Sequence, residues 1–111
     1  MSADEYGVLL TTLPDAEAAR RLASMLVEER LAACVQLTAI ESFYRWEGRI
    51  ANEPETLLLI KTATRLFEPA IARIKAVHPY TVPEIVGLPF SAGFAGYFNW
   101  IAQSTGAWRP I

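Results

Sequence analysis

The sequence is poor in the residues that cross-link small folds or hold metals tightly. Its 111 residues include one cysteine and one histidine, so an intrachain disulfide and a closed structural zinc site are both excluded within one chain. Its apolar runs fall far short of the ~18 residues that a transmembrane helix needs. The first residues, M-S-A-D-E-Y, have neither the basic start nor the apolar stretch of a signal peptide. These absences predict a soluble protein of the reducing cytoplasm that does not bind membranes.

The sequence also lacks an excess of charge of either sign. Ten Lys and Arg residues against twelve Asp and Glu residues give a formal net charge of −2, without the positive surplus that binding to phosphate backbones requires. Nucleic acid is therefore not an expected partner. What is abundant is apolar residues, at 52%, which is typical of a globular chain. Because the length is below the ~150 residues of an average domain, we expect a single domain over residues 1–111.

Hydrophobic spacing predicts alternating strands and helices. We expect Glu47-Gly48 to form a hairpin turn, Asp15 and Thr64 to cap the first two helices, and Pro83 and Pro89 to mark an edge or a bulge in the last strand. The final residues, G-A-W-R-P-I, are typical of a loosely held tail. The predicted strands are 6–13, 33–46, 53–64 and 80–90, and the predicted helices are 15–30, 65–77 and a short one at 94–104.

This order of elements predicts an α+β fold, the ferredoxin-like split βαβ sandwich (βαββαβ plus a short C-terminal helix). Both long helices should then cover one face of a four-stranded sheet and leave the other face open. The segments 8–10 and 57–60 are nevertheless apolar at consecutive positions, so both faces of their strands carry apolar side chains. One chain cannot cover both faces, and we expect sheet-to-sheet oligomers.

Two residues are candidate metal ligands. Cys34 lies between Ala33 and Val35, where a small core residue is the simpler interpretation. His78 either caps the second helix or belongs to a polar site with affinity for metals or anions. A Cys-His nucleophile pair has no supporting local signature, so an enzyme is not expected.

Other polar and aromatic residues are predicted to gather in a cleft where subunits meet. Lys61 follows an apolar run, so it either extends to solvent or meets a carboxylate, for which Glu84 is the natural partner. Junctions between subunits are favoured ligand sites. The residues assigned to this cleft, together with His78, are Tyr44, Trp46, Lys61, Tyr80, Glu84 and Trp100.

At these same positions the sequence resembles the CutA family of divalent-cation tolerance proteins. The resemblance covers most of the chain, with the motifs in the family's order and spacing. These motifs are L-L-T-T-L-P-D, L-V-E-E-R-L-A-A-C-V, Y-R-W-E-G-R-I, L-L-I-K-T and H-P-Y-T-V-P-E-I.

The resemblance implies a homotrimer, similar in architecture to PII signalling proteins, in which the hairpin from 33 to 64 reaches across to neighbouring subunits. It implies a role in divalent-cation tolerance, with copper the favoured ion and no organic cofactor. Thr11 and Val77 stand where metal-binding members carry a cysteine and a first histidine. His78, with Cys34 or carboxylates, is then expected to bind Cu(II) weakly. The alternative is a PII-like regulatory module that holds a small anion, metabolite or partner peptide.

Overall fold

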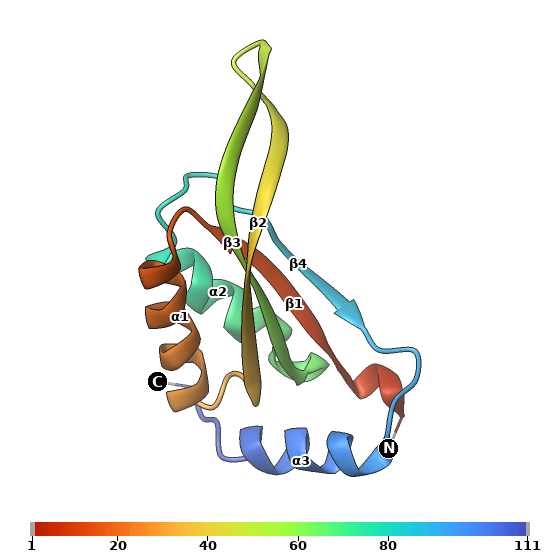
Figure 1. Ribbon diagram of the computed structural model, residues 1–111. Helices are drawn as coiled ribbons and strands as arrows, with labels where there is room; N and C mark the ends of the chain where they lie inside the picture. The colour runs from red at the N-terminus through yellow and green to blue at the C-terminus, as the bar shows by residue number, and fades with distance from the viewer. Residues whose placement is uncertain (1, 111) are drawn as a thin grey trace.

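The computed structural model describes residues 2–110; Met1 and Ile111, the last residue of the predicted tail, lie outside the described residues. The order of strands and helices is the predicted one (Figure 1). The elements are η1 (Ala3–Glu5), β1 (Tyr6–Leu13), α1 (Ala16–Glu28), β2 (Cys34–Trp46), β3 (Arg49–Ala63), η2 (Thr64–Leu66), α2 (Phe67–Val77), β4 (Ile85–Pro89) and α3 (Ala95–Thr105).

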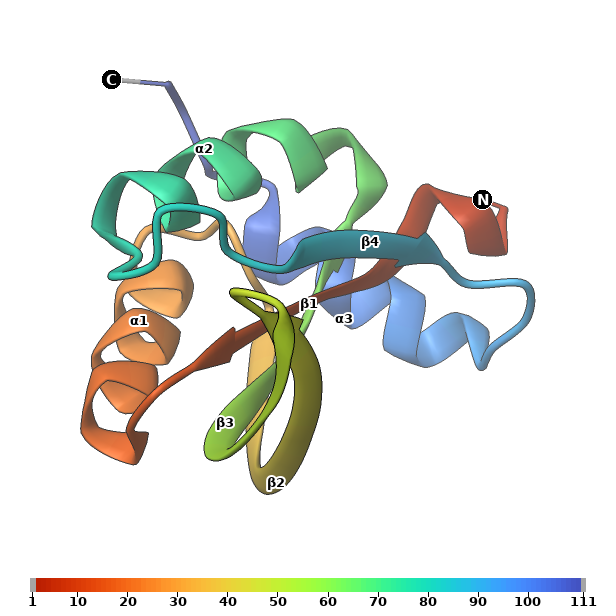
Figure 2. The ribbon, with the colours of Figure 1, turned by 90° about the horizontal axis from the view of Figure 1, so that it is seen from above.

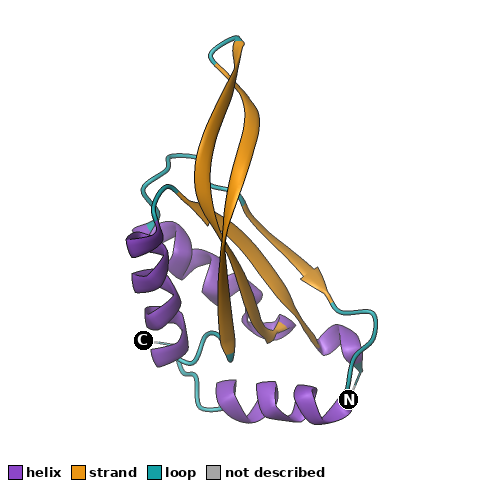
Figure 3. Cartoon of the chain, in the orientation of Figure 1, coloured by secondary structure: helices purple, strands orange, loops and turns teal. Residues whose placement is uncertain are grey.

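The four strands form one antiparallel sheet in the order β2-β3-β1-β4. α1 connects β1 to β2, and α2 connects β3 to β4, which is the ferredoxin-like α+β topology that the sequence predicts. The two helices lie beside one another on one side of the strands (Figure 2). The long β2–β3 hairpin projects well beyond them (Figure 3).

Local signals set the ends of several elements as expected. The Asp15 carboxylate caps α1 by accepting a hydrogen bond from the Ala18 N–H at 2.7 Å. At the hairpin tip, Glu47 and Gly48 have φ values of 49° and 80°, and the flanking Trp46 and Arg49 are paired. Two successive positive φ angles are typical of a type I′ turn, whose twist matches that of the strands.

Two strand boundaries differ from the prediction. β3 begins at Arg49, not at residue 53, and contains Pro54. The pairing of β1 with β3 ends at Leu13 opposite Thr56, so Pro54 lies where β3 has a single neighbour and a residue without an N–H is tolerated. β4 is confined to Ile85–Pro89, because the segment before it follows the local turn around His78.

The predicted helix cap at Thr64 is wrong, and the tail, although largely exposed, is anchored at one residue. Thr64 begins η2, α2 has no side-chain cap, and the Thr64 hydroxyl donates to the Asp4 carbonyl at 3.1 Å instead. In the tail, Trp108 is half-buried and packs against both clusters of core residues. An indole offers a large apolar area to bury, which holds the tail against the molecule.

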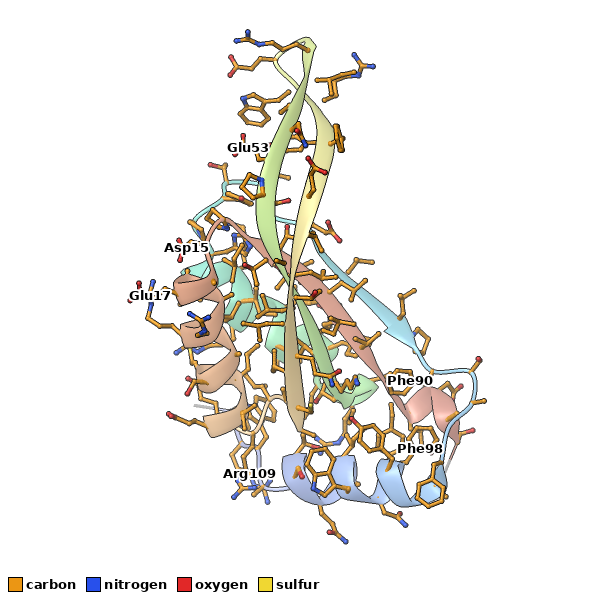
Figure 4. All side chains as sticks on the ribbon, in the orientation of Figure 1. Asp15, Glu17, Glu53, Phe90, Phe98 and Arg109 are labelled. Carbon is orange, nitrogen blue, oxygen red and sulfur yellow. The ribbon has the colours of Figure 1, made fainter. Side chains whose placement is uncertain are left out.

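The main core lies between the sheet and the pair α1 and α2. Leu9, Leu58 and Ile60 on the strands meet Leu26 and Ile74 on the helices, and all are fully buried. A smaller cluster lies under α3, where the rings of Tyr6 and Phe98 stack with centroids 5.0 Å apart and Phe90 lies 6.1 Å from Phe98. Figure 4 shows Phe90 and Phe98 at this end of the sheet.

The opposite sheet face is largely uncovered, and we call it the open face. Side chains alternate between the faces of a strand, and the register aligns Leu88, Val8 and Lys61 in one row across it and Val86, Leu10 and Leu59 in the next. The accessible surface is 6845 Å², against roughly 6,100 Å² for a typical monomer of this mass. The apolar members of the open face are Val8, Leu10, Leu57, Leu59, Val86 and Leu88.

Candidate functional site

A pair of phenol–carboxylate hydrogen bonds lies where the hairpin leaves the sheet. The Tyr44 hydroxyl donates to Glu53 Oε1 at 3.0 Å, and the Tyr80 hydroxyl donates to Glu55 Oε2 at 2.9 Å. Burial, followed by the bond to Glu55, raises the pKa of Tyr80, and the bond to Glu53 raises the pKa of Tyr44. Both tyrosines therefore act as hydrogen-bond donors to carboxylates, which are strong acceptors. Figure 4 places Glu53 on the projecting hairpin.

His78 lies beside this cluster and is buried, with both ring nitrogens engaged. The Tyr80 backbone N–H donates to Nδ1 at 3.1 Å, so Nε2 carries the proton and donates to the Thr12 carbonyl at 2.9 Å. The His78 and Tyr80 rings lie 5.0 Å apart. Burial lowers the pKa of His78, Lys75 lowers it further, and the Thr12 carbonyl and Glu55 oppose them. In this conformation the imidazole is a neutral link between the end of β1 and the loop after α2.

Cys34 and Lys61 lie at the other end of the open face. They face each other across β2 and β3, and both are half-buried. His78 bonds Thr12, whose partner on β3 is Leu57. Lys61 lies four residues further along β3, a separation of about 13 Å at ~3.3 Å per residue. Cys34 is therefore remote from His78 within one chain, and the expectation of a small core cysteine is only partly met.

Trp100 belongs to the Cys34 end. It lies on α3, is 44% exposed, and stacks on Tyr97 with ring centroids 5.6 Å apart. The pKa of Tyr97 is raised by burial, with a smaller contribution from Cys34. A second group thus lies at this end of the sheet, with Cys34 and Lys61 on the strands and Tyr97 and Trp100 on α3.

The remaining predicted cleft residues, Trp46 and Glu84, belong to neither group. Trp46 ends β2 at the hairpin tip, and Glu84 is exposed just before β4. Among residues 2–110, Lys61 and Glu84 form no ion pair, so their predicted pairing is not found within one subunit. The six predicted cleft residues therefore do not converge within one chain.

The described residues contain no group of three or more His, Cys, Asp or Glu side chains able to hold a metal ion. Thr11, where the resemblance implies a cysteine in metal-binding members, is fully buried on the helix side, and its hydroxyl has no hydrogen-bond partner in the described structure. Val77 is exposed at the end of α2. A tight metal site formed by one subunit is not supported by this arrangement.

The two carboxylates of the hairpin cluster were missed by the sequence reasoning. Glu53 could have been predicted from the hairpin register, which pairs it with Ser42. Tyr44 lies two residues after Ser42, so Tyr44 and Glu53 point to the same face of the hairpin. Glu55 carries no such signal, because its partner Tyr80 is 25 positions away and reaches it only through the turn after α2.

Within residues 2–110, no helix is both long enough and apolar enough to cross a bilayer. The CutA1 divalent ion tolerance protein family matches residues 7–104. A relative from Thermus thermophilus, "Divalent-cation tolerance protein CutA", is 50% identical over 100 residues, 89% of this chain and 97% of its own length. "Protein CutA, chloroplastic" from Arabidopsis thaliana is 43% identical over 88% of this chain, which spans 54% of that longer protein.

Solved structures give the same assignment. CutA from Synechococcus elongatus superposes with a TM-score of 0.91 at 35% identity, covering 95% of this chain and 94% of its own. The "Periplasmic divalent cation tolerance protein CutA" from Archaeoglobus fulgidus has a TM-score of 0.88 at 35% identity, over 90% and 98% of the two chains. Sequence and fold agree over nearly the whole length, and the chain belongs to the CutA1 divalent ion tolerance protein family.

Proposed function

We propose that the chain functions as a homotrimer in divalent-cation tolerance, without catalysing a reaction. In this assembly the open faces are buried between subunits, and each projecting hairpin reaches a neighbour, as in PII-like trimers. The subunit junction then unites the Tyr44–Tyr80 group of one chain with the Lys61–Trp100 group of another. Divalent cations, with copper favoured, act at or near this junction.

The open face is the observation that carries the proposal. Val86 and Leu88 on it are 44% and 51% exposed, and Val8, Leu10 and Leu59 line up beside them. Contiguous apolar surface of this kind is typical of protein interfaces. The hairpin adds Phe43, Trp46 and Ile50, all well exposed in the lone chain.

The test compares two valines of equal exposure on opposite sides of the molecule. Val86 is on the open face and Val27 is on α1, and each is 44% exposed. We expect sedimentation equilibrium to give three times 12.3 kDa for the wild type and for Val27→Lys, and a single-subunit mass for Val86→Lys. A wild-type mass of one subunit at all concentrations, or two variants that assemble equally well, would refute the assembly.

The cation part of the proposal rests on His78 and Cys34 and sets two structural conditions. A cation reaches an imidazole nitrogen only by displacing the Thr12 carbonyl or the Tyr80 N–H. Since Cys34 is remote within one subunit, it would have to come from a neighbour. Both conditions favour weak binding of Cu(II).

A copper titration of the assembled protein tests this part separately. We expect His78→Gln, which retains a donor for the Thr12 carbonyl, to weaken copper binding at least about tenfold, and Cys34→Ser to weaken it less. Equal copper affinity in His78→Gln and the wild type, with the trimer intact, would remove the metal role and leave the assembly standing.

The second candidate is a regulatory module that holds a small anion, metabolite or peptide at the same junction. It is favoured by the aromatic and hydrogen-bonding character of Tyr44, Tyr80 and Trp100. A thermal-shift panel of metals, nucleotides and carboxylic acids separates the two functions, because any ligand of the native state raises the melting temperature. Stabilisation by an organic ligand and by no metal would favour the module.

The proposed compartment is the cytoplasm. One half-buried cysteine suits a reducing environment, although named relatives include a chloroplastic protein and a periplasmic one. Cell fractionation with an antibody to the untagged protein tests the assignment.

A further inference from the structure

The C-terminal end of α3 gathers guanidinium groups from three distant parts of the chain. Arg30 donates to the Ser104 carbonyl at 3.2 Å, Arg65 donates to the Thr105 carbonyl at 3.5 Å, and Arg109 donates to the Gly106 carbonyl at 3.2 Å. The last carbonyls of a helix lack intrahelical partners and carry partial negative charge. Arg30 and Arg65 bond two of these carbonyls, and Arg109 bonds the carbonyl of Gly106, the residue that follows the helix.

A groove of about 610 Å³ opens beside this end, between α1, α2 and the tail. The groove is open to solvent rather than enclosed, so a ligand would lie against it with one side exposed. Much of its lining is apolar, with the half-buried Trp108 forming one wall. The apolar residues are Leu31, Pro69, Ala72, Ala76, Trp108 and Pro110.

The charged residues of the groove leave a positive surplus. Glu29 and Arg73 form a bidentate pair with both N–O distances at 2.9 Å, and this pairing neutralises the single carboxylate in the lining. Among the residues that the structure describes, Arg109 donates to the carbonyls of Gly106 and Trp108. Within residues 2–110 it has no carboxylate partner, and it is exposed at the rim. Figure 4 shows Arg109 near the lower end of α1.

We propose that this groove binds a small, flat organic anion, namely an aromatic ring that bears a carboxylate, sulfonate or phosphate group. Trp108 and the two prolines accept the flat apolar body, and Arg109 binds the anionic group, with Arg73 held in place beside it by Glu29. A bare inorganic anion would leave the apolar lining unused. Because the groove belongs to the helix side, it stays accessible when the open faces are buried in the proposed trimer.

The groove offers a direct optical test, because Trp108 is one of three tryptophans. In a Trp46→Phe/Trp100→Phe chain, Trp108 is the only indole, and its fluorescence reports on the groove. The probes are 8-anilinonaphthalene-1-sulfonate, a flat aromatic sulfonate, and N-phenyl-1-naphthylamine, which lacks the sulfonate. We expect the sulfonate to quench Trp108 by energy transfer and to bind at least about fivefold more tightly than the neutral analogue.

Two further variants in that chain identify the cation. Arg109→Gln should weaken binding of the sulfonate about fivefold to tenfold and leave the neutral analogue unchanged. The control is Arg20→Gln, an exposed arginine on the solvent face of α1, which should change neither affinity. Equal binding of the two probes, an unaltered affinity in Arg109→Gln, or a bound probe that leaves Trp108 fluorescence unquenched would overturn the proposal.

Discussion

The two faces of the sheet are built from the same strands, but one is covered by helices and the other is largely exposed to solvent. Leu58 points to the helices and is fully buried, whereas Leu59, the next residue, points to the open face and is half-buried. α1 and α2 complete the first face, and α3 reaches only one end of the second. The difference shows that apolar side chains occur both in a closed core and on an uncovered face, and that only the covering helices distinguish the two.

The overall dimensions express the same contrast. The molecule extends 46 Å along its longest axis, with a radius of gyration of 14.6 Å, against about 13 Å for a compact chain of this length. The projecting hairpin carries surface that the chain does not use for its own core. A compact half and an extended half therefore coexist in one short chain.

The largest effect should come from breaking the finished face. Leu58→Ala leaves a cavity in the closed core and should lower the free energy of unfolding by about 2–5 kcal/mol. Leu59→Ala, the matched variant, should cost only about 1 kcal/mol in separate subunits, because its side chain is already partly in solvent. Urea unfolding in the Val86→Lys background, which we expect to keep subunits apart, measures both. Equal losses would erase the distinction between the faces.

A smaller effect should come from two buried threonines on the helix side. The Thr62 hydroxyl donates to the Leu31 carbonyl at 2.7 Å, whereas the Thr11 hydroxyl has no partner within the described residues, and both side chains are fully buried. Thr62→Val should lower stability by about 1–3 kcal/mol because it leaves a buried carbonyl unpaired. Thr11→Val should be neutral or stabilising by up to ~1 kcal/mol.

The melting temperatures of the two threonine variants test whether each buried hydroxyl on the helix side has a hydrogen-bond partner. A destabilising Thr11→Val would show that this hydroxyl does have a partner in solution, such as a buried water.

The smallest effect should be a dependence of the free energy of unfolding on pH, caused by His78. Burial lowers the pKa of His78 in the folded chain below the ~6.5 of an unfolded histidine. The unfolded chain then binds the proton more tightly, so this contribution to stability is fully present above pH ~6.5 and is lost as the pH falls through the folded pKa. Chemical unfolding across pH 5–8 should show the slope in the wild type and not in His78→Gln. Identical slopes in the two proteins would assign the effect to another group.

Much of the fold could be predicted because its signals are local. The strand at Tyr6–Leu13, the cap at Asp15 and the turn at Glu47–Gly48 all agree with the structure. The loop after α2 could not be predicted in the same way. There the His78 imidazole bonds to Thr12, 66 positions away. Residues 80–84, predicted as the start of the last strand, form a loop after this contact instead.

The candidate site was less predictable than the fold. Tyr44 and Tyr80 were selected for their chemistry, and the structure does bring them to the same end of the sheet. The carboxylates that they bind, Glu53 and Glu55, are not among the predicted site residues. The predicted meeting of Lys61 with Glu84 depends on geometry between subunits and stays a prediction.

Hydrophobic periodicity, the helix and turn signals and the excess of apolar strand residues belong to the sequence by itself. They determined the α+β order of elements and the apolar character of both faces of the central strands, because both follow from neighbouring positions along the chain. Only the tertiary structure decided that His78 is a bonded link rather than a free ligand and that Trp108 secures the tail. It also decided that arginines from three segments meet at one helix end. Contacts between remote residues depend on how the sheet and helices pack, and no local pattern encodes that packing.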